Sequence, residues 1–148
     1  DLSFGATVCA GNGASNDCAS VPHIASGDVV EVERGPAFTS VGADDVLEPG
    51  STIAWSRESE RPVFVTLWPE QEFASAPPVF MATGDDSIEM PDLVALGLEW
   101  RTGAKYTIGV FQSSAHDTIE ELTAGDFGAR PSADGHYAYS SSRIVTLR

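Results

Sequence analysis

Catalysis in this sequence would have to use its three histidines and a number of serines and carboxylates. His116 and Asp117 are adjacent and follow Ser113 and Ser114. A catalytic triad needs a serine, a histidine and a carboxylate within hydrogen-bond distance, and adjacent residues rarely point at one another usefully. The sequence has no G-x-S-x-G motif, which would place a serine on a sharp turn. We therefore expect no enzymatic activity, and we interpret Asp117 as a helix cap.

Cys9 and Cys18 are the two cysteines, and the segment between them is made of Gly, Asn, Ser, Ala and Asp. An even number of cysteines around a flexible polar loop predicts a disulfide and an oxidising compartment. The spacing does not fit a zinc site, because no pair of histidines lies nearby. It also differs from the C-x-x-C spacing of redox dithiols. We expect a structural Cys9–Cys18 disulfide.

Two acidic pairs, Asp44-Asp45 and Asp85-Asp86, lie in segments predicted to be turns. Carboxylate oxygens on such loops are ligands that calcium prefers, so these four residues are the candidate metal ligands. The alternative is that they are ordinary turn residues, since no EF-hand loop is present. The histidines and cysteines do not cluster, which argues against a transition metal. Apart from calcium at these pairs, we expect no cofactor.

Three tryptophans would form a sugar-binding face if they were exposed together. The pattern of the strands instead predicts that Trp55 and Trp100 belong to the core. Trp68 is the exception, because Pro69 and a polar segment follow it. We expect Trp68 at the rim of the domain. A carbohydrate-binding function requires at least two exposed aromatic side chains on one face.

Charge and length exclude several classes of protein. The 148 residues include 22 acidic and 8 basic side chains, which gives a formal net charge of −14. Such a chain forms one domain of ordinary size, and its charge opposes binding to nucleic acid or to anionic membranes. No apolar run reaches the roughly 20 residues that span a bilayer. The chain begins at Asp1 rather than Met, as expected of a processed secreted protein.

The chain alternates between short β-prone runs and turns rich in Gly, Pro and Asp. Such spacing predicts an all-β antiparallel sandwich with one or two short helical turns. We expect a single helical turn at 91–97, between a proline and a glycine, and a helix that starts at Asp117. The expected strands are 2–8, 29–33, 51–56, 62–68, 78–83, 87–90, 105–111, 136–140 and 143–147.

From about residue 29 to residue 147 the order of these strands resembles a fibronectin type III or immunoglobulin-like domain. Residues 52–55 are similar to the second strand of that family, with Trp55 in the core. The run from Trp100 to Val110 is similar to its tyrosine-corner signature, although Trp100 stands where Leu is usual and Thr102 where Pro is usual. The resemblance implies that the ring of Tyr106 is buried and that its hydroxyl bonds to backbone a few residues upstream.

The resemblance divides the chain into two parts. Residues 1–27 form a disulfide-bearing N-terminal segment packed on or leading into the sandwich, and residues 28–148 form the sandwich itself. The connection 112–135 is longer than the family pattern, and long loops in compact domains carry structure or function. The candidate interaction residues of this loop are His116, Asp117, Glu120, Glu121, Asp126 and Arg130. The alternative is that the loop covers a sheet edge.

These observations favour a non-enzymatic, secreted or cell-surface module of a bacterial extracellular protein, with a structural or interaction role. We expect a protein or glycan partner, with self-assembly as a further option, and neither nucleic-acid binding nor membrane insertion. One alternative is a carbohydrate-binding module or adhesin subunit. Another is a small secreted hydrolase or inhibitor that uses the 112–135 loop, with His116 or His136 bonded to a carboxylate and a nucleophile.

Overall fold

The structure is a computed structural model that describes most of the chain. The described residues are 6–11, 15–21, 24–32, 34–73, 75–98, 102–113, 116–124 and 135–148. For residues 15–18, 20–21, 113 and 135–142 the description covers the backbone only.

The described residues form an all-β protein, as the sequence predicts, with one short helix near the predicted start at Asp117 and one at 71–73 that the sequence does not predict. The elements, in chain order, are β1 (Ala6–Gly11), β2 (Ser15–Val21), β3 (Ala37–Phe38), β4 (Val46–Leu47), β5 (Thr52–Ser56), β6 (Val63–Pro69), the 3-10 helix η1 (Gln71–Phe73), β7 (Val79–Thr83), β8 (Ser87–Glu89), β9 (Lys105–Ser113), α1 (Ile119–Ala124) and β10 (Gly135–Leu147). Within these residues no helix is long and apolar enough to cross a membrane.

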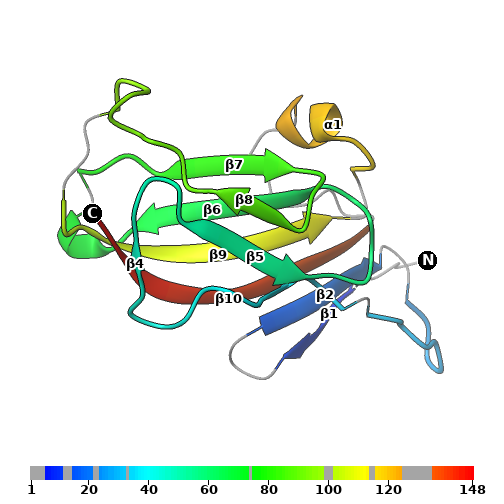
Figure 1. Ribbon diagram of the computed structural model, residues 1–148. Helices are drawn as coiled ribbons and strands as arrows, with labels where there is room; N and C mark the ends of the chain where they lie inside the picture. Colours follow the sequence, from blue (N-terminus) through cyan, green and yellow to red (C-terminus); the bar gives the residue numbers. More distant parts are fainter. Residues whose placement is uncertain are drawn as a thin grey trace.

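The strands form two sheets. The larger has the order β1-β2-β10-β9-β6-β7, with β4 also paired to β10, and the smaller has the order β3-β5-β8. In Figure 1 the smaller sheet lies in front of the larger one. The pairing is antiparallel except between β4 and β10, which run parallel. The N-terminal hairpin β1–β2 extends the larger sheet because β2 pairs with the first half of β10.

The hydrophobic core lies between the two sheets, an arrangement compatible with a β-sandwich. Alternate residues of β6, namely Val63, Val65 and Leu67, are fully buried there. Ile53 and Trp55 of β5 face them from the smaller sheet within the same core cluster, as their spacing predicts. Because side chains alternate along a strand, the intervening residues of β6 must lie on the opposite, outer face of the larger sheet.

Two expectations about the N-terminal part of the fold are wrong. Residues 29–32 form no strand, and Val29 is 88% exposed. A run of β-branched residues makes a strand only when a neighbouring strand and a core are available to it, and this segment has neither. Val8, predicted to lie on a half-buried face, is exposed in β1, because this hairpin lies at the end of the larger sheet.

The turn at residues 91–97 has a defined ending. The amide of Leu96 donates to the carbonyl of Asp92, which closes one turn, as predicted. The amides of Gly97 and Leu98 then donate to the carbonyls of Val94 and Leu93, each at 2.9 Å. This is a Schellman motif, which needs a left-handed residue at Gly97, and its φ is +79°. The turn projects from the domain at the upper left of Figure 1.

Candidate functional site

The outer face of the larger sheet carries exposed aromatic side chains, on the side turned away from the viewer in Figure 1. Trp68 of β6 is 50% exposed and Phe80 of β7 is 39% exposed. Phe64 of β6 lies on the same face and is buried. We call these three residues the aromatic face. Its two exposed members fulfil the condition that the sequence analysis set for carbohydrate binding.

The register of β6 and β7 brings these rings together. Phe80 is paired with Thr66, so it lies diagonally between Phe64 and Trp68, within reach of both. The rings of Phe64 and Phe80 are stacked, with centroids 5.8 Å apart. The ring of Trp68 meets Phe80 edge to face at 5.2 Å. Because each ring is held by the next, Trp68 presents an exposed indole whose position is fixed before any ligand arrives.

A polar pair lies directly beside Trp68. Thr107 of β9 is the register partner of Trp68, and its hydroxyl donates a short hydrogen bond to Oε1 of Glu70. The amide of Glu70 donates to the carbonyl of Lys105 at 2.9 Å, which fixes the backbone that carries this carboxylate. Oε2 of Glu70 accepts no hydrogen bond from the residues that the structure describes. A ligand on Trp68 would therefore find a carboxylate acceptor at the edge of the ring.

The predicted interaction loop is described in part. His116, Asp117, Glu120 and Glu121 lie within or next to α1, whereas Asp126 and Arg130 lie outside the described residues. Leu122 of α1 is buried, whereas Ile119 remains 38% exposed. The helix lies beside β7, the last strand of the larger sheet (Figure 1). The described part of the loop therefore favours a covering role over a binding role.

The helix cap differs from the prediction by one residue. Thr118, not Asp117, is the N-cap: its hydroxyl accepts from the amide of Glu121 at 3.1 Å. Glu121 reciprocates, since its Oε2 accepts from the amides of Thr118 and Asp117 at 3.3 and 2.9 Å. This is a capping box. The carboxylate of Asp117 instead pairs with Nε of Arg61 at 3.4 Å. The sequence offers two overlapping cap patterns, T-x-x-E from Thr118 and D-x-x-E from Asp117, and the helix uses the one from Thr118.

Among the described residues, His116 lacks the hydrogen-bonded carboxylate and nucleophile that a hydrolase needs. Its Nδ1 atom is buried and has no hydrogen-bond partner among the described residues. The nearby carboxylates of Asp117 and Glu121 are occupied by Arg61 and by the cap. Ser114 lies outside the described residues, and the side chains of Ser113 and His136 are not described.

The two cysteines lie opposite each other. Cys9 of β1 and Cys18 of β2 are register partners in the N-terminal hairpin, and Cys9 is not a free thiol. Directly opposed positions bring two Cβ atoms close enough for a cross-strand bond. The Cys9–Cys18 disulfide stays a prediction, and this register supports it.

Tyr106 of β9 is fully buried, and its burial raises the pKa of its phenol above the ordinary value. Its hydroxyl donates to the carbonyl of Pro77 at 3.3 Å, 29 residues upstream, in the connection that leads to β7. The expected partner lay only a few residues upstream, in the segment that contains Trp100. That tryptophan lies outside the described residues.

The two acidic pairs have structural partners. Oδ2 of Asp45 accepts from the amide of Gly42 at 2.6 Å, and Asp86 pairs with Nε of Arg57 at 2.6 Å. Asp44 adopts a left-handed conformation with φ of 62°, as asparagine and aspartate do in turns. Among the described residues no three or more potential metal ligands come together. Asp45 and Asp86 therefore hold turns in this structure, and calcium binding at the four residues stays a prediction.

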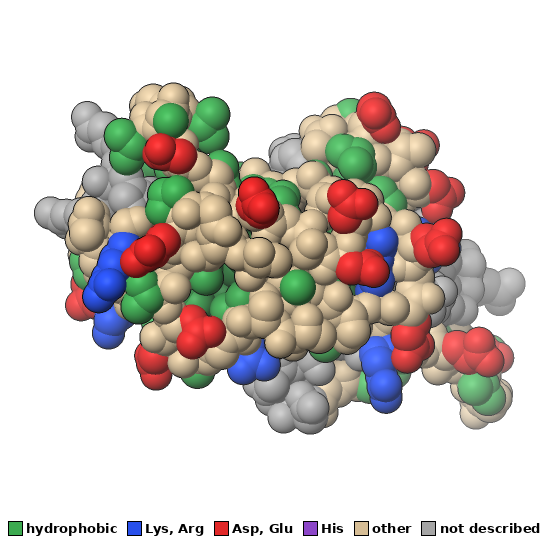
Figure 2. All heavy atoms as spheres, viewed as in Figure 1, with side chains coloured by type: hydrophobic (Ala, Val, Ile, Leu, Met, Phe, Trp, Pro, Cys, Tyr) green, Lys and Arg blue, Asp and Glu red, His purple; other side chains and the backbone are tan. Residues whose placement is uncertain are grey.

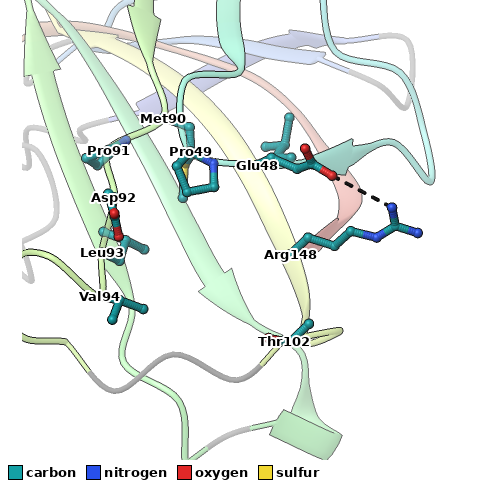
Figure 3. Close-up of a pocket in the computed structure, with 10 residues that line it drawn as sticks. Glu48, Pro49, Met90, Pro91, Asp92, Leu93, Val94, Thr102 and Arg148 are labelled. Atoms are coloured by element: carbon teal, nitrogen blue, oxygen red, sulfur yellow. Dashed lines mark ion pairs between the residues drawn. The ribbon is translucent and has the colours of Figure 1, made fainter.

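A small pocket lies at one end of the sandwich, beneath the 91–97 turn (Figure 3). Its volume is about 140 Å³, well below the roughly 300 Å³ of small ligand sites. Glu48 and Arg148 point toward each other at its edge, with the ion-pair atoms 3.7 Å apart. Apolar side chains such as Met90 and Leu93 form most of its wall. Its lining residues include no serine, cysteine or histidine.

Phe80 and Glu70 are site residues that the sequence analysis missed. Phe80 lies between Val79 and Met81, so strand alternation alone could have placed it on the face opposite these core residues. Glu70 follows Trp68 by two residues, so alternation could also have placed it on the same face as Trp68, whereas its contact with Thr107 depends on the pairing of β6 with β9.

No family model, no curated protein and no solved structure matches this chain. Its function must therefore be inferred from the residues and geometry described above.

Proposed function

We propose that this chain is a non-enzymatic, extracytoplasmic interaction module, built on an immunoglobulin-like or fibronectin III-like sandwich. In this proposal it binds its partner through the aromatic face. The observation that carries the proposal is the half-exposed Trp68, held in position by Phe80 on the outer face of the larger sheet.

The strand order supports the type of sandwich. β3-β5-β8 corresponds to strands A-B-E of an immunoglobulin-like domain, and β10-β9-β6-β7 corresponds to strands G-F-C-C′. In this correspondence Tyr106 lies near the start of strand F and Trp55 in strand B. The hairpin β1–β2 is then an addition to the edge of strand G.

The exposed rings support a binding role. Tryptophan is the residue most enriched among those that dominate binding energy, and a large exposed aromatic side chain costs solvation free energy unless a partner covers it. A fixed ring also loses little conformational entropy on binding. The contact with Phe80 provides this preorganisation.

The cysteines and the charge support the location. A disulfide between Cys9 and Cys18 would persist only in an oxidising compartment. Acidic side chains are spread over the face shown in Figure 2, as expected for a domain kept soluble by its charge.

The proposal is tested with a panel of immobilised probes that contains polysaccharides and extracellular matrix proteins. The wild-type domain is compared with Trp68→Ala and with Val29→Ser, which removes an even more exposed apolar side chain from a segment outside the sheets. We expect at least one probe to bind the wild type and Val29→Ser equally, and Trp68→Ala about tenfold or more weakly, a difference of about 1.4 kcal/mol. Binding that does not change in Trp68→Ala would exclude the aromatic face as the site.

A further inference from the structure

We infer that the partner of the aromatic face is a neutral, hydroxyl-rich saccharide. This inference rests on the proposed function and adds the chemical class of the ligand. It depends on three features of the outer face: the size of the exposed aromatic surface, the acceptor beside it, and the charge around it.

The exposed aromatic surface has the size of a sugar ring rather than of a protein interface. Only Trp68 and Phe80 are exposed in this group. Along the same register row, Thr107 separates Trp68 from the next exposed apolar side chain, Ile144 of β10. A stable protein interface buries about 800 Å² per partner around an apolar centre. The half-buried Phe111 of β9 lies opposite Phe64 on this face. The two exposed rings among the described side chains provide much less area than such an interface, but an indole covers the C–H face of one pyranose.

The second feature is the acceptor beside the ring. A saccharide that stacks on an aromatic ring directs its hydroxyl groups outward from the ring edge, where they require hydrogen-bond partners. Glu70 provides a carboxylate there, oriented by the hydroxyl of Thr107 through Oε1. Its Oε2 atom accepts no hydrogen bond within the described part of the chain, so it is available to sugar hydroxyls. An ionised acceptor makes hydrogen bonds about twice as strong as a neutral one.

The third feature is charge. A carboxylate at the ring edge repels the carboxylate or sulfate groups of acidic sugars, and the whole chain has a formal charge of −14. Lys105 lies opposite Glu70 across the β6–β9 pair. The negative charge of Glu70 offsets the positive charge of Lys105. The face therefore favours neutral sugars over anionic ones.

The experiment measures binding of the intact domain to neutral and anionic polysaccharides and to the protein probes of the panel above. The neutral probes are cellulose, chitin, xylan, mannan and amylose, and the anionic probes are polygalacturonate, alginate and heparin. The variants are Trp68→Ala, Glu70→Gln and the control Val29→Ser. Glu70→Gln keeps an acceptor for Thr107 and removes the charge. Circular dichroism and thermal melting establish that each variant is folded.

We expect a neutral polysaccharide to bind the wild type and Val29→Ser alike. Trp68→Ala should weaken this binding about tenfold or more, and Glu70→Gln should weaken it about threefold. A second measurement is independent of immobilisation: the bound polysaccharide should change the tryptophan fluorescence of the wild type but not that of Trp68→Phe.

Other results would overturn the inference in distinguishable ways. If anionic polysaccharides bind as tightly as neutral ones, or Glu70→Gln binds more tightly, the assignment to neutral sugars is wrong although the aromatic face remains the site. If only a protein probe binds and Trp68→Ala abolishes it, the partner is a protein and the proposed function stands. If no probe binds, or Trp68→Ala changes nothing, both the inference and the proposed function are wrong.

Discussion

The hydroxyl of Tyr106 donates a hydrogen bond to the carbonyl of Pro77, and this bond ties β9 to the connection before β7. Since the ring is fully buried and the hydrogen bond itself is partly buried, removal of the hydroxyl leaves the Pro77 carbonyl without this donor where access of water is restricted. We expect Tyr106→Phe to lower the free energy of unfolding by about 1–2 kcal/mol, as measured by urea denaturation. An unchanged midpoint would show that the bond contributes nothing.

The burial of Tyr106 also predicts that the stability of the protein depends on pH in the alkaline range. Burial disfavours the phenolate and raises the pKa of Tyr106 above its ordinary value of 10.0. The unfolded chain then loses this proton at lower pH than the folded protein does, so the contribution to stability is complete below pH 10 and declines as pH rises beyond it. Unfolding measured from pH 8 to pH 11 should show a steeper loss of stability for the wild type than for Tyr106→Phe. Equal slopes would contradict the shift.

Arg57 joins three segments at one end of the sandwich. Its guanidinium donates to Oδ1 of Asp86 at 2.6 Å and to the carbonyls of Arg61 and Gly84 at 2.6 and 2.5 Å. Only 11% of the side chain is exposed. We expect Arg57→Ala to destabilise the protein by about 2–3 kcal/mol, because hydrogen bonds from a charged donor are lost together.

Arg57→Lys is the matched control for this contact. It keeps the positive charge but cannot direct three donors in a fixed plane. We expect Arg57→Lys to keep less than half of the stability that is lost in Arg57→Ala, as measured by thermal melting. Complete recovery would mean that charge alone matters at this position.

The capping box of α1 predicts which of two adjacent residues matters. Thr118→Ala removes the acceptor for the amide of Glu121 and should cost about 1 kcal/mol. Asp117→Ala removes only an exposed ion pair with Arg61, which contributes at most about 1 kcal/mol and usually less. Chemical denaturation of both variants tests the order, and a larger effect at Asp117 would favour the cap predicted from sequence.

The Cys9–Cys18 bond can be tested by thiol titration. We expect the unfolded, unreduced protein to contain no free thiol, because the register of the hairpin places the two residues opposite each other. Reduction should release two thiols and lower the melting temperature. Two thiols before reduction would remove the main support for an oxidising compartment.

The strands that contribute to the core could be predicted, because their alternation follows burial. Ile53 and Trp55 are buried as expected, and the runs that became β6, β7 and β9 were found within one or two residues. Val29 shows the limit of this approach. Its segment has the composition of a strand, but tertiary structure offers it no partner.

The candidate site was only partly visible in the sequence. Trp68 stood out because Pro69 ends its strand, and its exposure agrees with the expected place at a rim. Glu70 lies only two residues from Trp68 in the sequence, but Phe80 and Thr107 come close to Trp68 only through the pairing of three strands, and register cannot be deduced from composition. The loop chosen as the interaction site instead uses Thr118 and Glu121 to hold a helix beside β7.

One side of β10 is shared between two partners, β2 along its first half and β4 at its end. This pairing also protects the protein against aggregation. Without β2 and β4, one side of this 13-residue strand would present unpaired backbone groups to other molecules, a template for intermolecular strand addition. Instead β2 covers residues 135–140 and β4 pairs at residues 146 and 147, with a register irregularity between Ser140 and Arg143. The edge of the sheet is thereby moved to β1, a strand of six residues. If its hairpin is closed by a disulfide, that short strand cannot separate from β2 and create a new edge there.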